Sequence, residues 1–219
     1  MVDLGVLISG RGSNLQAILD AIAEGRLDAR VRLVIANRAD AAGLERAERA
    51  GVPTRVIPHG AYPDRGSFDS ALVAALREAN VEWVVLAGFM RLLTPVFLDA
   101  FPRRVINVHP SLLPAFPGVD AQAQALAYGV KITGCSVHLV DAGMDTGPVI
   151  AQTAVPVLED DSRDTLAARI LPEEHGLLVR VLGWIAEGRV EIIEAPATPP
   201  TSPTSSARAR VRIRSGGPA

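Results

Sequence analysis

Two side chains suited to acyl-transfer chemistry lie two positions apart in this sequence, the amide of Asn107 and the imidazole of His109. They follow a short apolar run that predicts a buried strand, and Pro110 prevents regular structure beyond them. Side chains two residues apart on a strand lie on the same face, so the amide and the imidazole would be neighbours. An amide N–H can stabilise a developing oxyanion, and an imidazole can transfer a proton near neutral pH. An isolated Asn-x-His is more often a structured loop with a hydrogen-bonded histidine, so the interpretation depends on the neighbouring motifs.

The first predicted strand, residues 2–8, leads into a glycine-rich turn. Apolar residues at helical spacing follow, which predicts a helix that begins at Ser13 or Asn14. Free backbone N–H groups and the helix dipole converge at such a junction, and glycines allow an anion to approach closely. The pattern is not the dinucleotide fingerprint, because Leu15 takes the place of its third glycine, and it lacks the Gly-Lys of a Walker loop. It predicts a monophosphate site, with a tight turn that binds nothing as the alternative.

Strand and helix patterns alternate through the first half of the chain, which predicts a Rossmann-like α/β fold. The expected architecture is an open, mostly parallel, twisted sheet with helices on both faces. Ligands bind beyond the carboxyl ends of parallel strands, so the loops that carry Gly12, Met90 and Asn107 should meet at one edge. That convergence strengthens the catalytic interpretation of Asn107 and His109. Strands are expected at 2–8, 31–36, 54–57 and 81–87 (the most apolar and therefore central), with helices at 13–25, 41–50 and 68–79 and a short helix after Thr94.

An antiparallel hairpin is expected to extend the sheet in the C-terminal half. Its strands are 131–140, with one covered face, and 149–155. The loop between them contains Asp141 and Asp145, and acids in a glycine-rich loop are most often turn formers. Asp145 gains a functional role only if the fold brings it to His109, where a carboxylate would orient the ring.

Further elements are expected on either side of the hairpin. Residues 121–128 have a helical pattern. Ser162 should cap a second helix, which Pro172 is expected to interrupt or kink before the helix continues over 177–186. Residues 189–193 could then add a final edge strand.

Composition limits the class of protein. The 219 residues are 48% hydrophobic and 21% charged, and the net charge of −2 gives no reason to expect a nucleic-acid partner. No apolar run is long enough for a membrane span and no secretory leader is evident, so the chain is most simply cytoplasmic. The single cysteine, Cys135, excludes an intramolecular disulfide and is expected to be buried and inert. Residues 1–194 should form a single domain, whereas 195–219, rich in Pro, Ser, Thr and alternating Arg, predict a disordered tail.

Together these motifs resemble phosphoribosylglycinamide formyltransferase, a folate-dependent formyltransferase family of purine biosynthesis. The resemblance runs from about Val6 to Ile193 in the same order. The Asn-x-His-Pro-Ser-Leu-Leu-Pro run is specific to folate-dependent formyl transfer, and the glycine loop narrows the match to the glycinamide ribotide branch. The matching segments are SGRGSNLQ at 9–16, LAGFMR at 86–91, NVHPSLLP at 107–114 and MDTGP at 144–148.

The resemblance implies a reaction and a set of residue roles. The formyl group would pass from the cosubstrate 10-formyltetrahydrofolate to the amine of 5'-phosphoribosylglycinamide, with no metal or ATP and with small molecules as the only partners of a monomer or homodimer. Asn107 and His109 match the groups that stabilise the oxyanion, and Asp145 matches the carboxylate that keeps His109 charged and oriented. The ribotide site would lie in the N-terminal half, and the folate and catalytic site in the C-terminal half. The resemblance assigns the ribotide phosphate to Gly12, Ser13 and Asn14, its amine to Glu174, and the folate to Arg65, Met90, Arg91, Leu92, Leu93, Asn107 and Asp141.

The chain departs from the family pattern at two places. Some relatives carry a histidine where this chain has Val119-Asp120, which puts a ligand contact from position 120 in doubt. Leu171 and Pro172 stand where polar residues can occur, so phosphate contacts from that turn are also in doubt.

Three other functions remain open from the sequence. Formyltetrahydrofolate deformylase shares much of the motif set, but usually carries an extra N-terminal domain, whereas here the catalytic fold starts at Val2. Methionyl-tRNA formyltransferase typically has Arg-Gly near residues 117–118 and a further C-terminal domain. A non-catalytic nucleotide-binding module would explain the glycine loop and leave Asn107, His109 and Asp145 unexplained.

Overall fold

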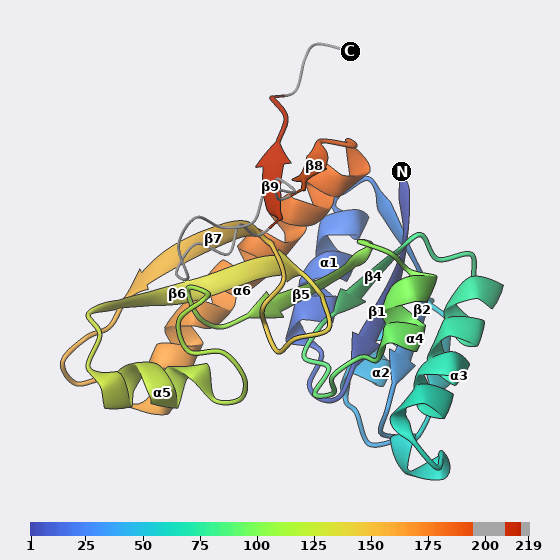
Figure 1. Cartoon of the computed structure of the whole chain (residues 1–219), viewed down its shortest axis with the longest axis horizontal. Helices are drawn as coiled ribbons and strands as arrows, with labels where there is room; N and C mark the ends of the chain where they lie inside the picture. The colour runs from blue at the N-terminus through green and yellow to red at the C-terminus, as the bar shows by residue number, and fades with distance from the viewer. Residues whose placement is uncertain (195–208, 216–219) are drawn as a thin grey trace, which may run out of the picture.

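The computed structural model describes residues 1–194 and 209–215, and its main feature is a seven-stranded twisted sheet (Figure 1). The strand order is β3-β2-β1-β4-β5-β6-β7, with parallel pairing through β5 and antiparallel pairing of β6 and β7. The predicted parallel sheet with a C-terminal hairpin is therefore confirmed, and β4 is its central strand. The strands are β1 (Val2–Ile8), β2 (Ala29–Ala36), β3 (Thr54–Val56), β4 (Trp83–Leu86), β5 (Val105–His109), β6 (Ile132–Leu139) and β7 (Val149–Pro156).

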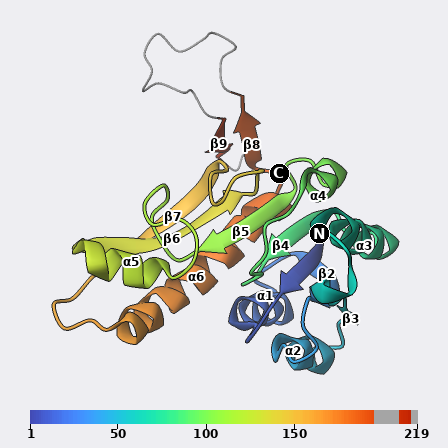
Figure 2. The same cartoon turned by 60° about the horizontal axis from the view of Figure 1, so that its bottom comes forward.

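Helices cover both faces of the sheet because its central strands are apolar on both sides. Side chains of β1 alternate between two cores: Val6 and Ile8 pack on one face, and Leu7 packs on the other. Helices α1, α2 and α6 cover the first face, and α3 and α4 cover the second (Figure 2). The helices are α1 (Ser13–Ala23), α2 (Gly43–Arg49), α3 (Arg65–Glu78), α4 (Pro95–Ala100), α5 (Ala121–Tyr128) and α6 (Arg163–Ala186), with a 3-10 turn at His59–Ala61.

Helix α6 is continuous, and the prediction that Pro172 interrupts it is wrong. Ser162 caps the helix as expected, through a capping box with Thr165. A proline inside a helix costs about 3 kcal/mol because it removes one backbone hydrogen bond. Here Pro172 is on the exposed side, while buried Ile170 and Leu177 continue the apolar stripe on either side of it. Packing of that stripe against the sheet keeps the two halves of the helix together. Among the described residues, no helix is both long and apolar enough to cross a membrane.

Strand β6 is buried on both faces, so the prediction of one covered face is also wrong. Cys135 and Val137 lie in the core as expected. The opposite face is covered by the segment that follows β5: Ser136 Oγ accepts from the Leu113 N–H at 3.0 Å and donates to the Ser111 carbonyl at 2.6 Å. Polar side chains on that face are thus buried with hydrogen-bond partners rather than exposed to water.

The last two strands differ from the sequence prediction. Strand β8 (Val190–Ile193) does not join the main sheet but pairs antiparallel with β9 (Arg210–Ile213) in a separate two-stranded sheet (Figure 1). The predicted disordered tail is therefore wrong for 210–213, and its other residues, 195–208 and 216–219, lie outside the described part of the chain. Charge alternation obscured the strand: the arginines of β9 are exposed, while Val211 and Ile213 pack against the core.

Candidate active site

The candidate site lies at the carboxyl edge of the sheet, where the strand order reverses. The chain proceeds from β1 outward to β3 and then returns to β4 on the other side of β1, which places a crevice between the ends of these two strands. The loops after β1 and β4 meet there, since the Met90 N–H donates to Ser9 Oγ at 3.0 Å. The loop after β5 carries Pro110 onward from the same edge. The predicted convergence of the three loops is confirmed.

The glycine loop ends in a helix N-terminus without a side-chain cap. Gly12 is the N-cap of α1 with φ 71°, a left-handed conformation that favours glycine, and no side chain hydrogen-bonds to the first turn. The first-turn N–H groups, from Ser13 onward, are thus available to an external acceptor, and the helix dipole adds positive potential. The geometry suits a phosphate monoester.

A buried carboxylate from α6 meets this helix start. Asn14 Nδ2 donates to Glu174 Oε2 at 3.2 Å, a contact between residues 160 positions apart. Both side chains are 8% exposed, and Asn14 Oδ1 has no partner. Burial raises the pKa of Glu174, although the hydrogen bond from Asn14 opposes the shift. A buried carboxylate next to an unused amide oxygen offers two acceptors to an amine.

Asn107 and His109 lie on one face of β5, and Asp145 reaches both from the β6–β7 loop. His109 Nδ1 is 3.4 Å from Asp145 Oδ2, and Asn107 Nδ2 is 3.4 Å from Asp145 Oδ1. The Gly118 N–H donates to Asp145 Oδ2 at 2.7 Å and holds the carboxylate in place. The structure therefore adds Asp145 to Asn107 and His109, which the sequence already predicted to share one face of a strand.

His138 joins this cluster, and the sequence reasoning missed it. It lies opposite Asn107 in the antiparallel pairing of β5 and β6, and its Nε2 is 3.2 Å from Asn107 Nδ2 and 3.5 Å from Asp145 Oδ1. His138 Nδ1 faces the Leu139 carbonyl at 2.9 Å and must carry a proton to bond it. The remaining nitrogen, Nε2, can bond only one of its two neighbours at a time: the neutral ring accepts from the Asn107 amide, whereas the protonated ring donates to Asp145 Oδ1. The alternation of β6 places His138 on the face opposite Cys135, but the pairing register decides its neighbours.

Hydrogen bonds keep the Asp145 carboxylate ionised. Burial raises the pKa of Asp145, but hydrogen bonds from His138 and Gly118, together with nearby His109, outweigh it and lower the pKa below its ordinary value. On the other side of the ring, His109 Nε2 is 2.9 Å from the Phe116 carbonyl. An acceptor therefore faces each ring nitrogen of His109, and the doubly protonated ring satisfies both.

The residues that the family resemblance assigns to the folate differ in their exposure to solvent. Met90 is 74% exposed, and the Arg91 guanidinium lies 5.4 Å from the centre of the Phe68 ring on α3. Leu92 is also exposed, whereas the side chain of Leu93 is buried in the core. Arg65 is exposed in the first turn of α3, and Asp141 lines a cavity together with Asp145.

The loop that carries residues 90–93 is held to α3 by a buried acid, Asp69. Asp69 Oδ2 accepts from both the Thr94 N–H, at 2.6 Å, and the Thr94 hydroxyl, at 2.7 Å. Thr94 is the N-cap of α4 as expected, but its side chain bonds Asp69 rather than the helix. This pair fixes the C-terminal end of the loop to α3.

Comparison with known proteins agrees with this geometry. The profile of the formyl transferase family matches residues 3–182. The chain is 44% identical to phosphoribosylglycinamide formyltransferase of Escherichia coli (strain K12), over 90% of this chain and 92% of that protein. It is 47% identical to the human trifunctional purine biosynthetic protein adenosine-3, of which it spans 19% of the length. Among solved structures, glycinamide ribonucleotide transformylase 1 from Symbiobacterium toebii aligns with a TM-score of 0.88 and 52% identity, covering 97% of this chain and 94% of that one.

The fold and the family match over most of the chain define the class: the chain belongs to the formyl transferase family. Within that class, relatives that it matches over nine-tenths of their length place it in the phosphoribosylglycinamide formyltransferase family.

Proposed function

We propose that this chain transfers the formyl group of 10-formyltetrahydrofolate to the amine of 5'-phosphoribosylglycinamide, a step of purine biosynthesis. The observation that carries the proposal is the contact of Asp145 with both Asn107 and His109, at 3.4 Å each. The cluster lies at the same sheet edge as an uncapped helix N-terminus and a buried carboxylate, Glu174. One edge thus combines groups for a phosphate, an amine and a reacting carbonyl.

The ribotide would be held at both ends. Its phosphate binds the first-turn N–H groups of α1, and its amine donates to Glu174, which Asn14 holds in place. This arrangement directs the nucleophile from the glycine loop toward the end of β5. Holding both reactants in line removes much of the entropic cost of their encounter.

The chemistry needs an oxyanion stabiliser and a route for a proton. The amine attacks the formyl carbon, and negative charge develops on the formyl oxygen. Asn107 Nδ2–H would turn from Asp145 Oδ1, and protonated His109 Nε2–H from the Phe116 carbonyl, to donate to that oxygen when substrate binds. Each such donor contributes on the order of 3 kcal/mol. Asp145 orients His109 and takes part in removing the amine proton, directly or through water. The folate nitrogen then leaves with a proton, and no covalent enzyme intermediate is formed.

The test is an absorbance assay of purified protein mixed with 10-formyltetrahydrofolate, with and without glycinamide ribotide. Loss of the formyl group from the folate only when the ribotide is present supports the transferase. Loss without the ribotide would identify a hydrolase instead. No turnover in either mixture would leave a binding module and refute the proposal.

A further inference from the structure

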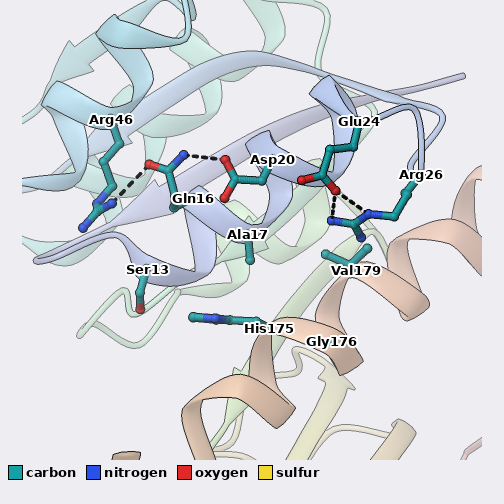
Figure 3. Close-up of a pocket in the computed structure, with 10 residues that line it drawn as sticks. All are labelled: Ser13, Gln16, Ala17, Asp20, Glu24, Arg26, Arg46, His175, Gly176 and Val179. Carbon is teal, nitrogen blue, oxygen red and sulfur yellow. Dashed lines mark hydrogen bonds and ion pairs between the residues drawn. The ribbon is translucent and has the colours of Figure 1, made fainter.

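Arg46 on α2 contacts the glycine loop from the side away from β4, and no step of the proposed reaction uses it. Its Nε donates to the Arg11 carbonyl at 2.9 Å, and its Nη1 donates to Gln16 Oε1 at 3.1 Å. Gln16 in turn donates to Asp20 Oδ1 at 2.8 Å, so a chain of hydrogen bonds along α1 fixes the guanidinium (Figure 3). Arg46 lines a cavity together with Ser13, the first residue of α1 (Figure 3).

A close contact of two glycines brings α2 against this loop. A Cβ on Gly12 would lie 2.6 Å from the Gly43 Cα, and one on Gly43 would lie 3.1 Å from the Gly12 Cα. The Gly43 N–H donates to the Gly10 carbonyl at 3.0 Å. Both loop carbonyls, of Gly10 and Arg11, therefore point toward α2 and are bonded there.

The direction of these carbonyls determines the direction of the loop N–H groups. In a planar trans peptide the C=O and the following N–H point in opposite directions. Bonding the Arg11 carbonyl to Arg46 thus turns the Gly12 N–H away from the Arg46 guanidinium. Without Arg46 that peptide could rotate and present a carbonyl, which repels an anion, instead of an N–H.

We propose that Arg46 is a positioning residue that keeps the glycine loop in its phosphate-binding conformation. The inference rests on the proposed function, since it takes the ribotide phosphate as the ligand of this loop. It predicts that Arg46 matters for the phosphate end of the substrate and not for the folate or for the chemical step.

The experiment compares Arg46→Met, Arg46→Lys and the control Arg49→Met by steady-state kinetics. Arg49 lies on the same helix and is exposed, paired with Glu45. Each protein is assayed with glycinamide ribotide and with glycinamide riboside, which lacks the phosphate, and inorganic phosphate is tested as a competitive inhibitor. Thermal melts check that every variant is folded.

For Arg46→Met we expect the KM for the ribotide and the Ki of phosphate to rise about tenfold, as for loss of one charge-assisted hydrogen bond. The kcat, the KM for the folate and the kcat/KM for the riboside should stay within about twofold of wild type. Arg46→Lys should recover part of the loss, because lysine can bond one of the two acceptors, and Arg49→Met should match wild type. An unchanged ribotide KM in Arg46→Met, or an equal loss with ribotide and riboside, would overturn the proposal. Failure of the wild-type protein to turn over the ribotide would instead refute the proposed function.

Discussion

Replacing Asp145 by Asn tests the catalytic cluster most directly, because it removes the charge with little change of shape. The carboxylate offers one oxygen to Gly118 and His109 and the other to Asn107 and His138. An amide has one oxygen only, so if that oxygen keeps the bond to Gly118, an NH2 group must face the Asn107 amide. The variant thus loses the negative charge beside His109 and places two donors against each other.

The expected magnitude follows from these contacts. Loss of a hydrogen bond to a charged group costs about 1.5–3 kcal/mol, which corresponds to a decrease in rate of about 10- to 150-fold. Displacement of the Asn107 amide from the oxyanion adds to this, since removal of one such donor lowers kcat about 10²- to 10³-fold. We therefore expect kcat of Asp145→Asn to fall at least about a hundredfold, with KM for both substrates within about threefold.

The assay is the ribotide-dependent absorbance change at saturating concentrations of both substrates. The control is Asp164→Asn at the start of α6, because Asp164 is exposed and pairs with Arg163 rather than with a histidine. Its kcat should stay within about threefold of wild type. If Asp145→Asn retained more than a tenth of the wild-type kcat, the catalytic role of the histidine–carboxylate pair would be refuted.

Three further changes test other parts of the structure. Burial raises the pKa of Glu174 in the folded protein. The stability that protonated Glu174 contributes is present below its unfolded-state pKa and is lost as pH rises through the raised folded-state pKa. Glu174→Gln should therefore raise Tm at pH 7.5 but not at pH 4, while raising the KM for the ribotide. A Tm of Glu174→Gln equal to that of the wild type at both pH values would contradict this. Asp69→Ala leaves the Thr94 N–H without its acceptor and should cost about 1–3 kcal/mol in chemical denaturation, with a higher KM for the folate; an unchanged denaturation midpoint would exclude the anchoring role. The Cys135 thiol, fully buried and with its pKa raised to about 12 by burial, should resist a disulfide reagent at pH 8 until denaturant is added, and rapid labelling of the native protein would show that this core opens.

Elements with a strong local pattern could be predicted from the sequence. The glycine turn and the helix that begins at Ser13 follow from the local preferences of glycine and of helical spacing, and the structure has both at the expected place. Errors arose where packing outweighed a local rule. Pro172 is tolerated because the buried stripe of α6 continues past it, and the β9 strand was hidden by its exposed arginines.

The contacts that make up the site are long-range, and this explains why they required the structure. Asn107 and His109 share a face because a strand alternates with period two, and this the sequence determined by itself. That Asp145 lies beside them and His138 lies opposite Asn107 depends on the register of β5 and β6 and on the hairpin loop. Register is set by which side chains the whole sheet buries, and a shift by one residue would turn His138 to the other face.

The proposed ribotide end of the site likewise combines a feature that local sequence predicts with contacts that only long-range packing decides. The residue types at 12–14 predicted a helix start suited to an anion, and the structure has the helix start there, because only groups close in sequence are needed for it. The meeting of Asn14 with Glu174, 160 residues away, and of Arg46 with the Arg11 carbonyl was decided by the packing of α6 and α2 against α1. Local sequence thus supplies the polar groups that the proposed reaction needs, and burial of the shared hydrophobic core brings them within hydrogen-bonding distance.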